Sequence, residues 1–398
     1  MKVFIDATSS CRSSQNTGMQ RMTRRIFAEL KQRLDVRPIS WNTAGNFYTE
    51  LGPRELLLLT RPFADRSSAM AHPEWRGEDP FTEFCRMLRR RRFNLDQEIS
   101  ATDVFLVPDI FRDRRREALP AFLKRTSART VAIFHDATDL RLTDVYPDRE
   151  RKSRPYLEAL ALFHLVICVS EEARNDLHHF WNKYGCRPTK TAVELWPGEL
   201  DGAQTIAVGD ESVDSILYVS SFHGRKNHLK LLDAAEQLWR ERLQFNLTLI
   251  GRNVGAPFNK IVCQIWKLGM RGRPLRWLRH VSDQTLLRAY RECRFTIYPS
   301  LMEGFGLPIT ESLLHGKPCI CGGNGALGEV AQGGGCLIIE QTKTDALAKA
   351  IRKLLSDRQL YTRLAAEARA RKFRSWSDYI DKFLTRLKPT VTETAASY

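Results

Sequence analysis

Short apolar runs alternate with amphipathic segments along the whole chain. The first run, Val3–Ile5, precedes a polar loop and then a segment in which Met22, Ile26, Phe27 and Leu30 share one helical face. Further strands are predicted at Val104–Val107, Thr130–Phe134, Leu165–Val169, Val193–Leu195, Ile216–Val219, Asn246–Ile250, Phe295–Tyr298, Pro318–Cys321 and Leu337–Ile339. Strands that alternate with helices in this way favour an α/β fold with parallel sheets covered by helices.

The alternation lapses once, at residues 198–213. The sequence there, GELDGAQTIAVGDES, is rich in Gly, Asp and Ser and has no usable period, so we interpret it as an interdomain linker. We therefore predict one α/β domain at residues 1–198, a second at residues 213–372, and a C-terminal segment and tail at residues 373–398.

Length and charge limit the classes of protein. The chain has 398 residues, enough for two domains with their own cores, and no stretch is apolar enough to span a membrane. The N-terminus, MKVFIDATSS, turns polar after five residues, so we expect a strand there and no secretory signal. Lys and Arg exceed Asp and Glu by 16 charges, which favours an anionic partner. Nucleic acid, acidic lipid and a phosphorylated substrate all fit that charge, as does a plain solvated surface.

The nine cysteines are scattered, and several lie inside apolar runs, as Cys168 does in LVICVS. This pattern is typical of buried, reduced thiols in a cytoplasmic protein. Cys319 and Cys321 form a C-x-C pair, but no second pair stands at the spacing of a zinc site. We predict neither a disulfide nor a metal at these residues.

Two segments combine cations with large apolar residues: RMLRRRRF at residues 86–93 and WKLGMRGRPLRWLRH at residues 266–280. One interpretation is a solvated surface whose aromatic rings pack inward. The other is contact with an anionic lipid surface or a lipid-linked acceptor.

The most informative segment is YPSLMEGFGLPITESLLHGKPC, which starts at Tyr298. A strand ends there, a turn containing Gly304, Phe305 and Gly306 follows, and Pro308 suits the first turn of a helix that Gly316 ends. Amide groups at a helix N-terminus form a favourable site for phosphate.

Two carboxylates, Glu303 and Glu311, flank this turn. A carboxylate beside a diphosphate is electrostatically unfavourable unless it accepts hydrogen bonds from hydroxyl groups, as sugars provide. A ligand with both a diphosphate and many hydroxyls satisfies both features, and a nucleotide-sugar is such a ligand. An ordinary strand–turn–helix unit with two surface glutamates is the alternative.

A second cluster lies in ILYVSSFHGRKNHLKLLDAAEQL. Arg225 and Lys226 come just after a predicted strand, and we expect Asn227 to cap the following helix with its side chain. Two cations at the carboxyl end of a strand suit a departing diphosphate. Exposed cations at a helix start are the alternative.

These motifs resemble a known family. Glu303 and Glu311, separated by seven residues, resemble the E-x7-E signature of family 4 retaining glycosyltransferases, which have the glycosyltransferase B fold. The segments NGALGEV, Gly333–Gly335 and SDQTLLRAYREC are similar to the same family, and the resemblance covers nearly all of residues 213–385. It implies two Rossmann-like domains that face each other across a cleft, the first for the acceptor and the second for the nucleotide-sugar donor.

The resemblance also implies roles for individual residues. Glu303 would bind donor-sugar hydroxyls near the reacting carbon, and Glu311 would bind the ribose. Gly304, Phe305 and Gly306 would present amides to sugar or phosphate. Arg225 and Lys226 would hold the phosphates, although many relatives separate these two cations by several residues.

In the first half, the family likeness places Gly18 in a loop near the donor phosphates and gives His135 a role beside the donor sugar. A plain loop and a core or helix-capping His135–Asp136 pair are the alternatives. Ser170 is expected to cap a helix. The segment SWSDYIDKFL, with its apolar residues Trp376, Tyr379 and Phe383, would be a helix that crosses back to the first domain.

The predicted reaction is transfer of a hexose with retention at the anomeric carbon. No D-x-D run flanked by strands occurs, so we expect no metal and no cofactor beyond the nucleotide-sugar. The RKN loop resembles that of O-antigen mannosyl- and rhamnosyltransferases, which suggests GDP-mannose as donor and a glycan or lipid-linked acceptor in bacterial surface polysaccharide synthesis. A cytoplasmic enzyme, with peripheral contact at the inner membrane face as one interpretation of its basic surface, fits that role.

Two alternatives stay open. One is another enzyme on this fold: a nucleotide-sugar epimerase, or a phosphorylase-like protein, although no pyridoxal phosphate motif is visible. The other is a non-catalytic assembly or nucleic-acid-binding protein that uses the positive charge; we expect no nucleic acid partner, because the carboxylates and the lysine of the motif are all present.

Overall fold

The computed structural model describes residues 1–13, 17–43, 45–60, 90–198, 214–254 and 259–387. These residues form two compact units. The first unit contains the described residues up to Pro197 and those from Arg374 onward, and the second contains Gly198 and the described residues up to Phe373. Most of the predicted linker, and the first four residues of the predicted basic segment at 86–93, lie outside the described residues.

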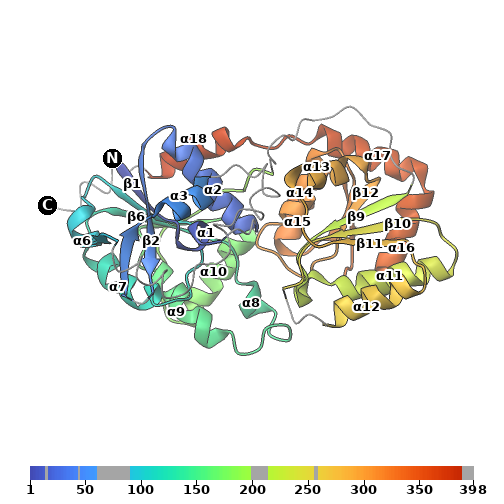
Figure 1. Cartoon of the computed structure of the whole chain (residues 1–398), viewed down its shortest axis with the longest axis horizontal. Helices are drawn as coiled ribbons and strands as arrows, with labels where there is room; N and C mark the ends of the chain where they lie inside the picture. The colour runs from blue at the N-terminus through green and yellow to red at the C-terminus, as the bar shows by residue number, and fades with distance from the viewer. Residues whose placement is uncertain (14–16, 44, 61–89, 199–213, 255–258, 388–398) are drawn as a thin grey trace. The chain divides into compact units, whose positions relative to one another are not determined.

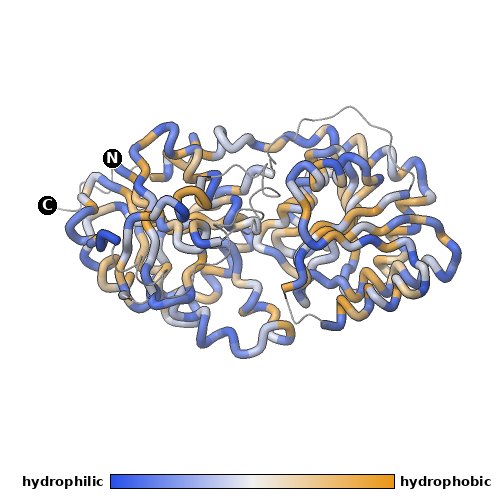
Figure 2. The backbone as a smooth tube through the Cα atoms, in the orientation of Figure 1, coloured by the Kyte–Doolittle hydropathy of each residue, from blue (hydrophilic) through white to orange (hydrophobic). Residues whose placement is uncertain are grey.

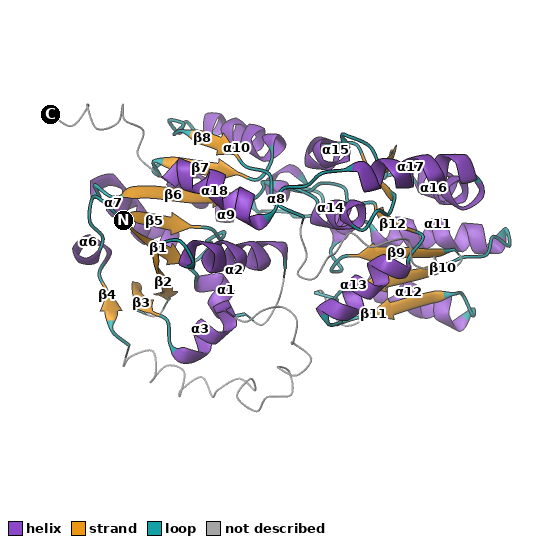
Figure 3. Cartoon of the chain, turned by 90° about the horizontal axis from the view of Figure 1, so that it is seen from above, coloured by secondary structure: helices purple, strands orange, loops and turns teal. Residues whose placement is uncertain are grey.

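The first unit is built on an eight-stranded sheet (Figure 1) whose strand order, β4-β3-β2-β1-β5-β6-β7-β8, can be followed in Figure 3. Its strands are β1 (Lys2–Asp6), β2 (Asp35–Asn42), β3 (Phe47–Glu50), β4 (Arg92–Phe93), β5 (Val104–Val107), β6 (Arg129–Phe134), β7 (Leu165–Cys168) and β8 (Thr191–Val193). The sheet is parallel except for β3 and β4, which pair antiparallel at one edge. Strands β5, β6 and β7 are buried along their whole length, which explains their uninterrupted apolar runs.

The helices of the first unit are α1 (Thr8–Cys11), α2 (Gly18–Lys31), α3 (Pro53–Thr60), α6 (Leu95–Glu98), α7 (Arg115–Arg125), α8 (Thr138–Arg141), α9 (Glu150–Leu160), α10 (Glu171–Lys183) and α18 (Trp376–Leu387). The prediction of a last strand at Val193–Leu195 was wrong by two residues. Pairing with β7 ends at Val193, and Leu195 is 40% exposed.

The C-terminal helix α18 belongs to the first unit, as predicted. It packs against α2, and Trp376, Tyr379 and Phe383 are buried. A helix that follows the second unit in sequence thus completes the core of the first.

A buried carboxylate fixes the same helix. The side chain of Glu194, next to β8, has no solvent exposure and lies 3.2 Å from Arg374, 3.0 Å from Lys382 and 3.2 Å from Arg386. Because a buried charge is costly unless it is paired, Glu194 requires these three cations and so holds α18 in place.

The second unit contains a six-stranded, fully parallel sheet in the order β11-β10-β9-β12-β13-β14 (Figure 3). Its strands are β9 (Ser215–Val219), β10 (Asn246–Ile250), β11 (Leu275–Leu278), β12 (Phe295–Tyr298), β13 (Cys319–Gly322) and β14 (Cys336–Ile339). Its helices are the 3-10 turn η3 (Gly224–Lys226), α11 (His228–Arg240), α12 (Lys260–Met270), α13 (Asp283–Glu292), α14 (Leu307–Leu314), α15 (Gly325–Ala331), α16 (Thr344–Ser356) and α17 (Arg358–Ala370). In Figure 2, the central strands form the hydrophobic interior, and hydrophilic stretches alternate with hydrophobic ones along the outer helices.

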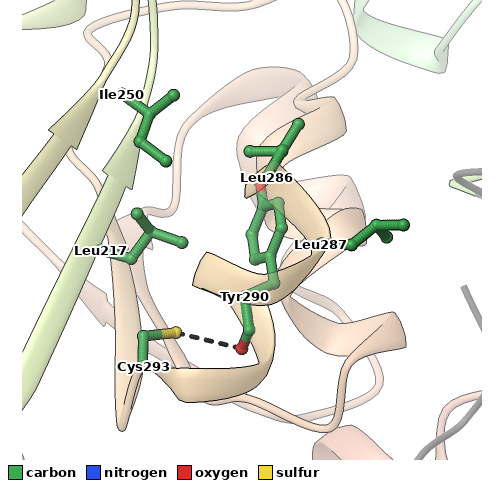
Figure 4. Packing of buried hydrophobic residues seen from close by; sticks show 6 residues of the cluster. All are labelled: Leu217, Ile250, Leu286, Leu287, Tyr290 and Cys293. Carbon is green, nitrogen blue, oxygen red and sulfur yellow. Dashed lines mark hydrogen bonds between the residues drawn. The ribbon is translucent and has the colours of Figure 1, made fainter. Parts of the chain in front are cut away.

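Helix α13 is held to this sheet by a compact apolar cluster (Figure 4). The cluster consists of Leu217, Ile250, Leu286, Leu287, Tyr290 and Cys293. Tyr290 is fully buried, and its hydroxyl donates to Glu311 of α14 at 2.7 Å. The apolar core therefore also orients one of the two carboxylates predicted from the sequence.

Candidate functional site

Strand order explains why the two predicted motifs meet. Strand β9 lies between β10 and β12. After β9 the chain continues toward one edge of the sheet, to β10, and after β12 it continues toward the other edge, to β13. The two strands pair parallel, with Ile216 opposite Phe295, and their carboxyl ends lie at one edge. Ligands of open α/β sheets bind at such a switch point.

The loop after β9 forms the single turn η3 and then enters α11. Asn227 adopts a left-handed conformation with φ 58°, and its side-chain amide donates to the carbonyl of Gln341 at 2.7 Å. The prediction that Asn227 caps α11 with its side chain was wrong, because that side chain bonds to a distant loop instead. Its backbone conformation aims Arg225 and Lys226 toward the loop after β12.

Glu303 collects four contacts on one oxygen. Its Oε1 lies 2.5 Å from Lys226 Nζ and 2.5 Å from a guanidinium nitrogen of Arg225. The hydroxyls of Tyr298 and Ser300 donate to the same oxygen at 3.0 Å and 2.5 Å. Within the described residues these four contacts all end on Oε1, and the side chain is 9% exposed.

These contacts set the charge of the site. Burial would raise the pKa of Glu303, but the cations of Arg225 and Lys226 outweigh it and hold the pKa well below the usual value. Burial and the Glu303 charge raise the pKa of Tyr298 well above 10. Two cations and one carboxylate leave a net charge of +1, which is suited to part of a diphosphate.

The turn after Glu303 depends on a glycine. Gly306 has φ 109°, a conformation that other residues rarely adopt, and it directly precedes α14. Phe305 is buried beside it, and Pro308 occupies the first turn of the helix as predicted. The backbone of Gly304–Gly306 thus leads into a helix N-terminus, the position that the sequence predicted.

Glu311 lies in different surroundings. It is on α14, is 2% exposed, and accepts the hydroxyl hydrogen of Tyr290. Its orientation is therefore fixed from the apolar core, whereas Glu303 is fixed by cations. Ribose binding by Glu311 stays a prediction from the family resemblance.

Gln341 is a residue of this centre that the sequence did not reveal. Its side-chain amide donates to the carbonyl of Ser300 at 3.3 Å and to the side-chain oxygen of Asn324 at 2.6 Å, while its main-chain carbonyl accepts from Asn227. The loops after β9, β12, β13 and β14 are tied together in this way. A Cβ at Gly322 would lie 2.4 Å from the Gln341 amide, so the Gly322–Gly323 pair was the available signal.

In the first unit, His135 is buried at the end of β6. Its Nε2 donates to the carbonyl of Pro108 at 2.6 Å, and its Nδ1 has no protein partner in the described part of the chain. The rings of Trp196 and His135 form a T-shaped pair with centroids 5.3 Å apart, and burial lowers the pKa of the histidine. Asp136 accepts a hydrogen bond from the amide of Thr138, the first residue of α8, at 3.0 Å, but the N-cap residue of this helix is Ala137. His135 does not cap a helix and lies in the core, as the second alternative had it.

Gly18 is the first residue of α2, where Thr17 and Gln20 form a capping box. Ser170 caps α10, since its hydroxyl accepts from the amide of Ala173 at 3.0 Å, which confirms the prediction. Roles for Gly18 and His135 in binding a donor stay predictions.

The described residues contain no group of three or more His, Cys, Asp or Glu side chains that could hold a metal ion. Burial and neighbouring thiols raise the pKa of both Cys319 and Cys321 well above its usual value. Over the same residues, none of the helices is both long and apolar enough to cross a membrane.

Comparison with known proteins identifies the kind of domain to which these loops belong. Residues 208–371 match the model of the family described as glycosyl transferases group 1. The chain is 24% identical over 376 residues to the serotype-specific mannosyltransferase WbdA of Escherichia coli, covering 89% of this chain and 43% of WbdA. It is 30% identical over 247 residues to the O-antigen chain mannosyltransferase B of Escherichia coli, covering 59% and 64% of the two chains. The chain thus spans less than two thirds of the length of these relatives.

Solved structures show the fold. Sucrose-phosphate synthase from Thermosynechococcus elongatus superposes with a TM-score of 0.68 at 16% identity, over 100% of this chain and 99% of the other. Anabaena Alr3699/HepE, in complex with UDP and glucose, gives 0.64 at 18% identity, over 97% and 100%. The chain therefore carries a glycosyltransferase group 1 domain at residues 208–371, and its two parallel-sheet units have the glycosyltransferase B fold.

Proposed function

We propose that this protein is a retaining, metal-independent hexosyltransferase that uses a nucleotide-sugar. The observation that carries the proposal is the arrangement of Glu303: two cations and two hydroxyls hold its Oε1, so Oε2 is the oxygen that would accept a sugar hydroxyl. A carboxylate with one oxygen paired and the other available can accept a hydroxyl beside a diphosphate without an uncompensated charge.

Lys226 and Arg225 would bind the departing diphosphate. As the bond between the anomeric carbon and the phosphate oxygen breaks, negative charge develops on that oxygen, and fixed cations in a buried site stabilise it more than water does. With two cations present, this step needs no divalent ion.

The acceptor hydroxyl would attack from the face that the diphosphate leaves. Its oxygen forms the new bond to the anomeric carbon, and its proton passes to the departing phosphate oxygen. The products are a glycoside of retained configuration and a nucleoside diphosphate, and no protein nucleophile is required.

The relatives guide the choice of substrates. WbdA and the O-antigen chain mannosyltransferase are both mannosyltransferases by name, so we propose GDP-mannose as donor and a glycan or lipid-linked glycan of a bacterial surface polysaccharide as acceptor.

The test is incubation with GDP-mannose and a mannose-containing oligosaccharide acceptor, with UDP- and dTDP-sugars in parallel, followed by NMR of the product linkage. We expect an α-mannoside and activity that survives EDTA. A product of inverted configuration would contradict the retaining mechanism. Activity that EDTA removes and Mg²⁺ restores would contradict metal independence. Conversion of the nucleotide-sugar without acceptor would favour an epimerase, and no turnover with binding to random DNA would favour the non-catalytic alternative.

A matched pair of variants tests the site. Lys226→Met removes a buried cation that contacts Glu303, and we expect turnover to fall by about a thousandfold, the scale measured when one charge-stabilising donor is lost. Lys230→Met removes an exposed cation four residues away on α11 and should leave turnover unchanged. Equal activity of the two variants would remove this assignment.

A further inference from the structure

Helix α12 has an unusual outer face. One side of the helix is buried against the sheet, through Ile261, Val262, Ile265 and Leu268. On the other side, Trp266 is 63% exposed and Met270 is 84% exposed. These two residues are four positions apart, so their side chains are neighbours on one face of the helix. They form a ridge of apolar surface that nothing in the described chain covers.

Cations accompany this ridge. From Asn259 to Ser282 the chain contains six Lys and Arg residues and no Asp or Glu. Lys260 and Lys267 lie seven positions apart on α12, which places them on the same side of the helix, and both are exposed. Lys267 directly follows Trp266, so charge and apolar surface adjoin.

Two carboxylates of the neighbouring helix α11 lie near this charge. Asp233 is exposed and accepts a hydrogen bond from Gln264 of α12 at 3.3 Å, so it supplies one negative charge beside the two lysines. Glu236 is buried and lies 2.9 Å from Arg240, 3.1 Å from Arg271 and 2.7 Å from Arg273. Three cations around one carboxylate leave a net charge of +2 at the C-terminal end of α12.

The edge strand β11 continues the basic surface. It lies next to α12 in the structure (Figure 3) and carries exposed Arg276. Exposed Arg279 follows β11 and lies over the ring of Trp277 at 4.5 Å, which holds the guanidinium in place.

We propose that this surface, made of the outer face of α12 and of β11, docks the protein on an anionic lipid bilayer. Trp266 and Met270 would enter the boundary between headgroups and acyl chains, and Lys260 and Lys267 would lie among the lipid phosphates. Aromatic and apolar side chains flanked by Lys and Arg are the composition of helices that lie in a membrane interface. This inference does not depend on the donor site.

The described part of the other basic segment, residues 90–93, lacks these features. Of its described residues, Arg90 pairs with Glu55 and Arg91 pairs with Glu98. Arg92, the remaining described cation of that segment, lies over the ring of Phe47 at 5.1 Å. Among the described residues, Lys260 and Lys267 have no ion-pair partner.

Charge also favours lipid over a second copy of this chain. Each copy carries a net charge of +16 and would bring the same six cations to a shared interface. Like charges across an interface oppose association. Anionic headgroups attract cations instead, and each Lys or Arg near the surface contributes about 1 kcal/mol to binding.

The test is sedimentation of the full chain with vesicles of phosphatidylcholine containing phosphatidylglycerol, and with phosphatidylcholine alone. We expect binding to the anionic vesicles only, weakened at high salt because salt screens surface charge. Lys260→Gln/Lys267→Gln should lower the affinity for anionic vesicles about 25-fold, because the loss of each cation lowers it about fivefold. Trp266→Ala/Met270→Ala should lower it about tenfold or more, since buried apolar area is lost.

A charge-matched control is Lys349→Gln/Lys353→Gln, on α16, where both lysines are also exposed and four positions apart. This variant should bind within about twofold of the parent if local placement decides, and all variants should keep the parent circular dichroism spectrum. Absence of binding to anionic vesicles, or equal loss in the control and the α12 variants, would overturn the proposal. A dimer in solution that Trp266→Ala/Met270→Ala dissociates, without vesicle binding, would instead assign this surface to a second copy.

Discussion

Replacing Glu303 with Gln tests the electrostatics of the site without changing its shape. In the folded chain, Oε1 of this carboxylate is the counter-charge for Lys226 and Arg225. The amide keeps the volume but leaves two largely buried cations without an anion. Removing one partner of a buried ion pair costs about 3–5 kcal/mol, and about 2–4 °C of melting temperature corresponds to each kcal/mol in a domain of this size. We therefore expect the second unit to melt roughly 6–20 °C lower at neutral pH.

The pH dependence gives the sign of the effect independently. The folded-state pKa of Glu303 lies below its ordinary value of 4.5, so the stabilisation is fully present above that pH and is lost as the pH falls toward the folded-state pKa. The difference between the parent and Glu303→Gln should therefore shrink in acid. Thermal unfolding followed by circular dichroism between pH 3.5 and 7.5 measures it.

Glu292→Gln is the matched control. Glu292 also lies 2.5 Å from an arginine, Arg288, but both side chains are more than half exposed. Exposed pairs contribute about 0–1 kcal/mol, so this variant should melt close to the parent. If Glu303→Gln also melts within 2 °C of the parent at pH 7.5, the cations are not held by this carboxylate and the reasoning is refuted.

Two further predictions concern other buried groups. Asp109 accepts hydrogen bonds from Thr23 and Ser10, and burial raises its pKa from 3.8 to about 6, so its ionisation destabilises the fold as the pH rises between those values. Asp109→Asn should raise the free energy of unfolding by up to about 3 kcal/mol at pH 7.5, which corresponds to about two pKa units, and should change it little at pH 3.5. Urea unfolding at both pH values measures this difference, and an equal effect at both would contradict the prediction. Gly322→Ala should displace the flexible end of Gln341 at a small cost in stability. It should nevertheless weaken GDP binding by about five- to thirtyfold, because the lost hydrogen bonds of Gln341 are worth about 1–2 kcal/mol. Titration calorimetry should give the same loss for Gln341→Ala and no further loss in the double variant, whereas additive losses would show that the two residues act separately.

The sequence alone determined the α/β architecture and most of the strands. Continuous apolar runs such as Val104–Val107 and Phe295–Tyr298 are buried on both faces of a parallel sheet, and that environment leaves a pattern in the sequence. Other strands leave a weaker pattern: β2, inside the first sheet, contains Pro38, and the edge strand β11 carries Arg276 and Trp277, so both were missed. The turn at Gly306 was also predictable, because its glycine and the proline after it answer local backbone requirements.

Only the tertiary structure decided which oxygen of Glu303 is paired, that Tyr290 orients Glu311, and that Gln341 joins four loops. Each of these contacts joins residues from separate parts of the chain, and the distances between their side chains follow from the order of the strands in the sheet. Local sequence specifies elements through propensity and burial pattern, whereas strand order arises from packing of the whole sheet. For the same reason, Asn227 looked like a helix cap in the sequence but bonds to Gln341, which is 114 positions away.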